Sequence, residues 1–204
     1  FMVDKVFEFA YSPDGQKIVL SGQRNGQSDI YVYYLLGSRT EQITNDIYDD
    51  RYPSFAERDR KIVFSSNRKN DTLNLDQPFA ALPYNNDIFV YDLMRRNPVL
   101  ERITNTPGSD ETHPFEFSQG EYSFLSNQNG INNRFIALYD STIARIDTVI
   151  HYRYFSNTYA LTNVSRDILY YDYQPFTKEY AFLTVECGKF RFYKGYTEND
   201  KPIP

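Results

Sequence analysis

Apolar and polar residues alternate along most of the chain in short runs, as in "EFAYS", "KIVLSG" and "DIYVYYL" near its start. Alternation with a period of two sends successive side chains to opposite faces of a β-strand. The runs are separated by turn sequences such as "SPDG", in which Pro presets φ and Gly accepts a positive φ. The pattern predicts an all-β protein built from hairpins.

The strand pattern recurs four times. The first strands read "EFAYS", "YPSFA", "PFEFS" and "YYDYQ", and the third strands read "DIYVYYL", "DIFVYDL", "RFIALYD" and "KFRFYKG". Three copies add a fourth strand that ends in "EQITN", "ERITN" or "YALTN", with the last Asn at positions 45, 105 and 163. The four repeats span approximately residues 1–46, 47–106, 107–163 and 164–204.

Four antiparallel strands in a repeat of this length are typical of β-propeller blades. A β-sandwich would also explain the alternation and the aromatic residues, but not the recurring endings. We therefore predict propeller blades of four antiparallel strands, in four repeats, with the last blade lacking its outermost strand. Closed four-bladed rings are uncommon, which favours part of a larger propeller. If the ring did close, the N-terminal "MVDKV" would supply the missing strand.

Several stretches resemble the WD-type repeat of the TolB-like β-propeller family. They are "FAYSPDGQKIVLSGQRNGQSDIYVY", "RYPSFAERDRKIVFSSNR", "NDIFVYDL" and "ERITNTPGSDETHPFEFS". The resemblance covers three repeats clearly and the fourth weakly. It implies a propeller fold and a periplasmic or cell-envelope location. The family also includes propellers attached to prolyl-oligopeptidase-type hydrolases, so the fold does not specify the function.

Composition narrows the classes of partner. The chain has 19 Tyr and 16 Phe but no Trp, a bias that favours strands. Its net charge of −5 and the lack of a basic run argue against a nucleic-acid partner. A single cysteine, Cys187, excludes an internal disulfide framework. No apolar stretch approaches the roughly 18 residues that cross a bilayer, so no direct membrane insertion is expected.

Catalytic signatures are missing from the sequence. It contains no G-x-S-x-G nucleophile motif and no glycine-rich phosphate loop before a helix. Its two histidines, His113 and His151, fall in different kinds of segment. A metal site built from His113, Asp110 and Glu111 is conceivable but would need fixed geometry within one short loop. We expect no enzyme activity, cofactor or metal.

The connections between repeats carry the candidate site. Acidic residues in these loops are expected to converge at one mouth of the central channel, with aromatic residues between them. The candidate residues are Asp49, Asp50, Tyr52, Asp110, Glu111, His113 and Asp167. Acidic, turn-forming residues also suit exposed loops without any function. An insertion in the second repeat, residues 69–85, adds Phe79 and Tyr84 on the same face as an apolar lid.

A second insertion, residues 141–157, alternates well enough to be a β-extension on the opposite face. The sequence favours a noncatalytic propeller that binds a protein or peptide, of basic and apolar character, in the bacterial cell envelope. The alternatives are a regulatory or substrate-gating propeller of a larger hydrolase and a propeller-type lyase or hydrolase.

Overall fold

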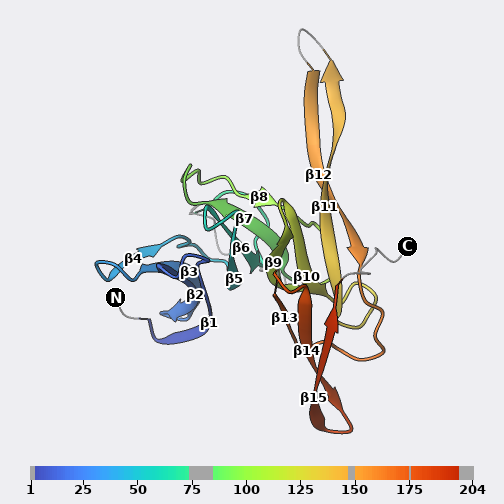
Figure 1. The fold of residues 1–204 in the computed structure, drawn as a ribbon. Helices are drawn as coiled ribbons and strands as arrows, with labels where there is room; N and C mark the ends of the chain where they lie inside the picture. The colour runs from blue at the N-terminus through green and yellow to red at the C-terminus, as the bar shows by residue number, and fades with distance from the viewer. Residues whose placement is uncertain (1–2, 74–84, 147–149, 175, 198–204) are drawn as a thin grey trace.

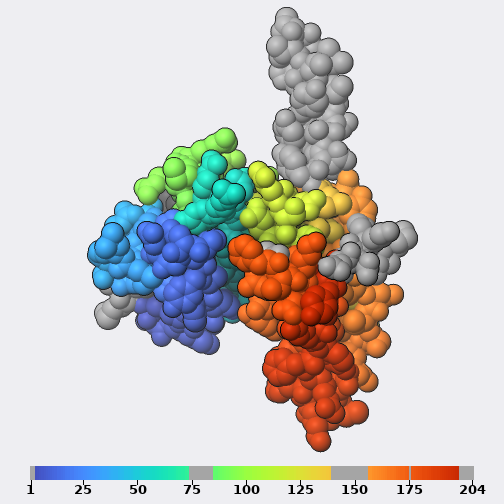
Figure 2. Space-filling model, in the orientation of Figure 1, coloured from blue at the N-terminus to red at the C-terminus, as the bar shows by residue number. Residues whose placement is uncertain are grey.

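The computed structural model describes residues 3–73, 85–146, 150–174 and 176–197. Every regular element in these ranges is a β-strand, and the fifteen strands form four antiparallel sheets that follow one another along an arc (Figure 1). The space-filling view places the first sheet (blue) and the fourth sheet (orange to red) at opposite ends of this row (Figure 2). The predicted all-β fold of four blades is confirmed.

In each blade the strands pair in chain order. The first blade contains β1 (Lys5–Tyr11), β2 (Lys17–Arg24), β3 (Gln27–Tyr34) and β4 (Arg39–Gln42). The second contains β5 (Asp50–Ala56), β6 (Lys61–Ser66), β7 (Asp87–Asp92) and β8 (Glu101–Arg102). The third contains β9 (Glu111–Ser118), β10 (Glu121–Ser126), β11 (Asn133–Ile146) and β12 (Ile150–Ala160). The fourth contains β13 (Tyr170–Gln174), β14 (Glu179–Glu186) and β15 (Lys189–Tyr196).

The last blade thus has three strands in the described ranges, as predicted. The N-terminal segment does not complete it. Lys5 and Val6 instead pair with Gln23 and Gly22 as the first part of β1. The described sheets do not close into a ring, so the conditional prediction that "MVDKV" would supply the missing strand is not tested.

The core lies between neighbouring blades, because each strand sends alternate side chains to the blade before and the blade after it. Between the first two blades, buried Val19, Ile30 and Val32 share one cluster with Ile62, Phe64 and Phe89. Between the second and third, Val63, Ile88 and Val90 share a cluster with Tyr122, Phe124 and Phe135. Between the third and fourth, Leu125 joins Ile168 and Tyr171.

The recurring Thr of the "I/L-T-N" endings fastens the end of each fourth strand to the third. Oγ1 of Thr44 accepts the N–H of Ile30 at 2.9 Å. Thr104 and Ile88 repeat this bond at 2.8 Å, and Thr162 and Arg134 repeat it at 2.9 Å. The hydroxyl therefore takes a buried backbone donor that the ending strand no longer satisfies. This bond explains why Thr recurs at the end of the first three repeats.

The hairpin turns that precede β2 and β6 are held in different ways. In "SPDG" Gly15 has φ 67, which glycine accepts without strain. In "ERDR" the residues Glu57, Arg58 and Asp59 all have positive φ, between 47 and 68. Neighbouring blades hold this second turn: Lys17 forms an ion pair with Asp59, and the N–H of Glu57 donates to Oε2 of Glu116 at 2.8 Å.

Two insertions interrupt the repeat. The predicted β-extension is confirmed, because β11 and β12 pair far beyond the blade as a two-stranded arm (Figure 1). The second-blade insertion begins along its own sheet, where the N–H of Leu73 donates to Pro98 O at 2.8 Å. Phe79 and Tyr84 lie outside the described residues, so the predicted lid stays a prediction. No helix in the described ranges is long and apolar enough to span a membrane.

Candidate functional site

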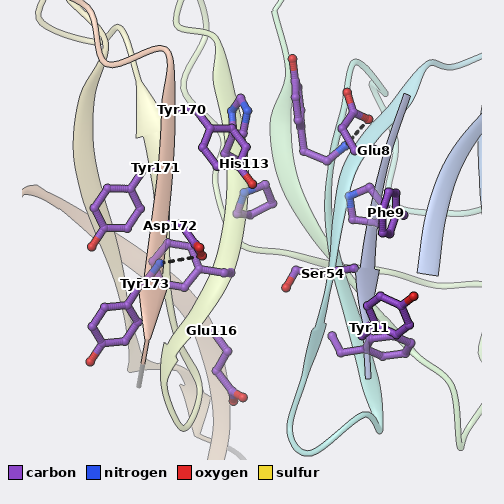
Figure 3. Close-up of a pocket in the computed structure, with 16 residues that line it drawn as sticks. Glu8, Phe9, Tyr11, Ser54, His113, Glu116, Tyr170, Tyr171, Asp172 and Tyr173 are labelled. Carbon is purple, nitrogen blue, oxygen red and sulfur yellow. Dashed lines mark hydrogen bonds between the residues drawn. The ribbon is translucent and has the colours of Figure 1, made fainter. Parts of the chain in front are cut away.

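The four innermost strands line a cavity of about 380 Å³ that we call the groove (Figure 3). Each blade contributes four consecutive residues from its first strand. The lining stretches are residues 8–11 of β1, 52–55 of β5, 113–116 of β9 and 170–173 around the start of β13. The same position of the repeat thus supplies one wall segment per blade, as expected for residues facing a propeller channel.

Bulges in β5 and β9 turn two side chains into the groove. In β5 the register shifts between Arg51 and Ser54, so that Tyr52 and its following Pro lack regular partners. The same shift in β9 places His113 before Pro114. Tyr52 has φ 54 and His113 has φ 52, a conformation that costs about 1–3 kcal/mol for residues with a side chain. Bulges that re-aim side chains are common beside functional sites.

Planar side chains from all four inner strands form what we call the stacked row: Phe7, Arg51, Tyr52, His113 and Tyr170. The Arg51 guanidinium lies 3.8 Å from the Phe7 ring centre and 5.3 Å from that of Tyr52. The rings of Tyr52 and His113 are 4.0 Å apart at 31°. Tyr170 meets His113 edge-on at 5.4 Å, as Figure 3 shows. The row connects the first blade to the fourth, and its members Tyr52, His113 and Tyr170 line the groove.

The charged side chains in the groove are carboxylates, and one of them, Glu8, is already paired. Glu8 accepts from Nε of Arg51 at 3.2 Å and from the N–H of Tyr52 at 3.4 Å. Burial lowers the pKa of His113 to about 4, so the imidazole is neutral at pH 7. Asp172 on β13 is exposed and also lines the groove. The groove therefore offers aromatic faces and carboxylates, which suit a cationic ligand better than an anion.

Three of the predicted acidic residues form hydrogen bonds between neighbouring blades. Each occupies the same position of its inter-blade loop, and its Oδ1 accepts a hydrogen bond from a residue at or just before the start of the third strand of the preceding blade. Asp49 accepts from Ser28 Oγ at 2.6 Å, Asp110 from the N–H of Asn86 at 3.0 Å, and Asp167 from the N–H of Asn132 at 2.7 Å. Asp49 and Asp167 remain exposed, and Asp110 is half-buried.

Asp50 and Glu111, the next residues along, turn inward. They are 0% and 1% exposed, respectively. Both oxygens of Asp50 accept from Nη2 of Arg68 at 2.9 Å, and Glu111 accepts from the Thr106 hydroxyl. The expectation of one accessible rim of five carboxylates is therefore corrected: alternation along the strand buries these two between the blades, where they cannot touch a partner at the surface.

The structure brings Tyr52 and His113 together, as the sequence analysis expected of residues at one channel mouth. Sequence reasoning missed Glu8, Tyr170 and Asp172. The available signal was the alignment of the four first strands, which places "EFAY" and "YYDY" opposite "YPSF" and "HPFE". In the described part of the chain, no group of three or more His, Cys, Asp or Glu residues is arranged to hold a metal ion.

No protein-family model matches the sequence, and no curated protein matches it significantly. Solved structures do match in fold. A TolB structure from Acinetobacter baumannii superposes with a TM-score of 0.67 at 16% identity, over 97% of this chain. A putative TolB from Agrobacterium tumefaciens gives a TM-score of 0.72 at 14% identity, over 98% of this chain.

The chain has a TolB-like propeller fold. It spans 42% of the Acinetobacter chain and 65% of the Agrobacterium chain, so these TolB-like propellers extend beyond the four blades seen here. A dipeptidyl peptidase 4 from Porphyromonas gingivalis also matches, with a TM-score of 0.47 at 10% identity over 95% of this chain and 38% of that one. That likeness is too distant to carry an argument about function.

Proposed function

We propose that this TolB-like propeller is a noncatalytic module of the bacterial cell envelope that binds an extended protein or peptide segment of basic and apolar character in its groove. The stacked row is the observation that supports this proposal. It brings planar side chains from four strands into contact, and two of these residues, Tyr52 and His113, have a positive φ.

The chemistry of the groove favours such a segment. Aromatic side chains contribute most of the binding energy in many interfaces, because they bury a large area with few rotamers to fix. Asp172 and Asp49, both exposed, attract basic residues and speed the encounter. Phe79 and Tyr84 belong to the insertion of the second repeat, and we propose that they add apolar contacts to the bound segment.

The envelope location is supported by the two TolB structures, although the likeness is one of fold. A noncatalytic role is supported by the surroundings of His113. Its Nδ1 lies 3.1 Å from Oγ1 of Thr112, its chain neighbour. With a pKa near 4 the ring is also a weak base at neutral pH.

The test uses two labelled peptides of about ten residues that share apolar positions and differ only in basic or acidic ones. Fluorescence anisotropy with the full chain should show binding of the basic peptide. Changing Tyr52→Ala and His113→Ala together should weaken it at least about tenfold, equivalent to roughly 1.4 kcal/mol. The matched control is Phe176→Ala, because this side chain is 95% exposed in a turn outside the groove and should have no effect.

Two further measurements bear on the charges and on catalysis. Asp49→Asn with Asp110→Asn should slow association and flatten its salt dependence, whereas Phe79→Ala should mainly speed dissociation. Intact mass of the peptide after long incubation reports turnover. Equal binding of both peptides, or unchanged binding by the Tyr52 and His113 variant, would refute the groove proposal; cleavage that His113→Ala abolishes would refute the noncatalytic one.

A further inference from the structure

The joint between the second and third blades contains a buried carboxyl group without a cation. The joint consists of Asn86 and Asp87 from the second blade, Thr104 and Thr106 after β8, and Asp110 and Glu111 at the start of the third. Glu111 is 1% exposed, and its backbone N–H donates to Asn86 O at 3.1 Å. Thr106 donates to Oε1 of Glu111, but Oε2 has no hydrogen-bond partner within the described residues.

The equivalent carboxyl one blade earlier is neutralised. Asp50 receives two hydrogen bonds from Arg68, which follows Ser66 and Asn67. In the third blade Gln128 follows Ser126 and Asn127 at the same place. The two sites correspond in detail: Asn67 Oδ1 accepts the N–H of Asp49 at 2.9 Å, and Asn127 Oδ1 accepts the N–H of Asp110 at 2.7 Å. Gln128 is exposed and brings no charge.

The other charged groups around Glu111 do not compensate it. Asp87 and Asp110 are acidic and disfavour a second negative charge. Arg102 from β8 lies beside this joint but is engaged with Asp87 at 2.8 Å and Asp71 at 2.7 Å. An unpaired carboxylate buried in this position would be costly, whereas the protonated acid is neutral and can donate a hydrogen bond.

We propose that Glu111 carries a proton when the second and third blades are closed on each other, and that loss of this proton loosens the joint and the start of β9. Burial raises the pKa of Glu111 to about 7, which is consistent with this protonation state. His113 stands two residues further along β9, so the same event would reach the groove. This last step rests on the proposed function, whereas the protonation of the joint does not.

The experiment compares urea unfolding of the full chain at pH 5.5 and pH 8.0 for the natural sequence and for Glu111→Gln. A folded pKa of about 7 against the ordinary 4.5 predicts that the unfolding constant of the natural protein rises about thirty-fold more over this range than that of the variant. Other titrating groups, such as Asp29, are present in both proteins and cancel. A purely structural role would instead shift the variant equally at both pH values.

A second variant tests the missing cation directly. Gln128→Arg supplies the guanidinium that Arg68 supplies one blade earlier, and it should remove the extra pH dependence while Glu111 is kept. Hydrogen exchange at Thr106 and Glu111, corrected for intrinsic rates, should show protection falling toward pH 8.0 only in the natural sequence. These readouts need no ligand, so their failure is separate from failure of the groove proposal.

Parallel pH profiles for the natural protein and both variants would overturn the proposal. So would full recovery of stability at pH 8.0 by millimolar Ca²⁺, because a cation and not a proton would then neutralise Glu111. If the basic peptide bound equally well at pH 5.5 and pH 8.0, the protonation of Glu111 would still stand, but its proposed effect on the groove would be refuted.

Discussion

The first joint, between the first and second blades, and the third joint, between the third and fourth, are packed with different kinds of side chain. In the first joint, Asp29 and Asp50 are buried with the fully buried cation Arg68. In the third joint the corresponding positions hold Asn133 and Ile168, both 0% exposed. Asn133 Oδ1 accepts from Thr162 Oγ1 at 2.9 Å and from the N–H of Val164 at 2.8 Å. The third joint thus keeps the hydrogen bonds and lacks the two carboxylates, while its buried cation, Arg134, donates to the Tyr171 hydroxyl at 2.6 Å.

This difference teaches that the charges are not what defines a joint. A buried ion pair costs desolvation that its attraction only partly offsets, so an apolar replacement of similar volume is often neutral. What all three joints share is the Thr fastening and an apolar cluster. Buried ionic groups are therefore present in some joints and not required in all of them. Where they are present, the stability of the joint depends on keeping both charged partners.

The largest expected loss of stability comes from removing the buried cation of the first joint. Arg68→Met leaves Asp50 and Asp46 buried without their cation and should lower the free energy of unfolding by about 3–5 kcal/mol in urea. Adding Asp50→Ile, which copies the third joint, should recover most of this loss. A double variant no more stable than Arg68→Met would show that the charges are needed for packing.

The third joint should be weakened most by a cavity in its apolar cluster. Ile168→Ala removes a side chain that is 0% exposed and should cost about 2–4 kcal/mol. The matched control is Leu36→Ala, since Leu36 is 89% exposed and its truncation should change stability little. Equal unfolding midpoints for the two variants would mean that Ile168 does not support the joint as described.

The pH response should separate the two joints further. Burial raises the pKa of Asp29 to about 7, and nearby Asp50 and Asp46 add to the effect. Because the folded form holds a proton that the unfolded form releases near pH 4, stability falls as pH rises from about 4 to 7. Asp29→Asn, which copies Asn133, should reduce that loss by roughly 2 kcal/mol in urea unfolding at pH 5 and pH 8. An unchanged pH profile would contradict this assignment.

The smallest effect should be the same in all joints. Thr44→Val, Thr104→Val and Thr162→Val each remove the acceptor for one buried N–H and should each cost about 1–2 kcal/mol in thermal or urea unfolding. Similar losses would support the view that the Thr fastening is independent of the charges. A loss confined to the first two joints would show that the hydroxyl acts through the neighbouring carboxyl instead.

Much of the fold could be predicted because its signals are local. Alternation and repeated endings located the four blades, the β-extension and the three strands that the last blade has in the described residues. The site was only partly predictable. Tyr52 and His113 lie 61 residues apart, and only the arc of the sheets and the two bulges put their rings 4.0 Å from each other. The inward turn of Asp50 was also hidden, since its partner Arg68 belongs to a loop whose path the alternation pattern does not describe.

The sequence by itself determined which residues face the two sides of each strand and which segments repeat, because a strand's period of two is a property of the local backbone. Only the tertiary structure decided which carboxylates are buried and which rings stack. Burial and stacking depend on the neighbouring blade, whose residues approach through space and not along the chain. Two adjacent aspartates therefore differ: Asp49 accepts a hydrogen bond from Ser28 of the preceding blade, whereas Asp50 forms a buried ion pair with Arg68.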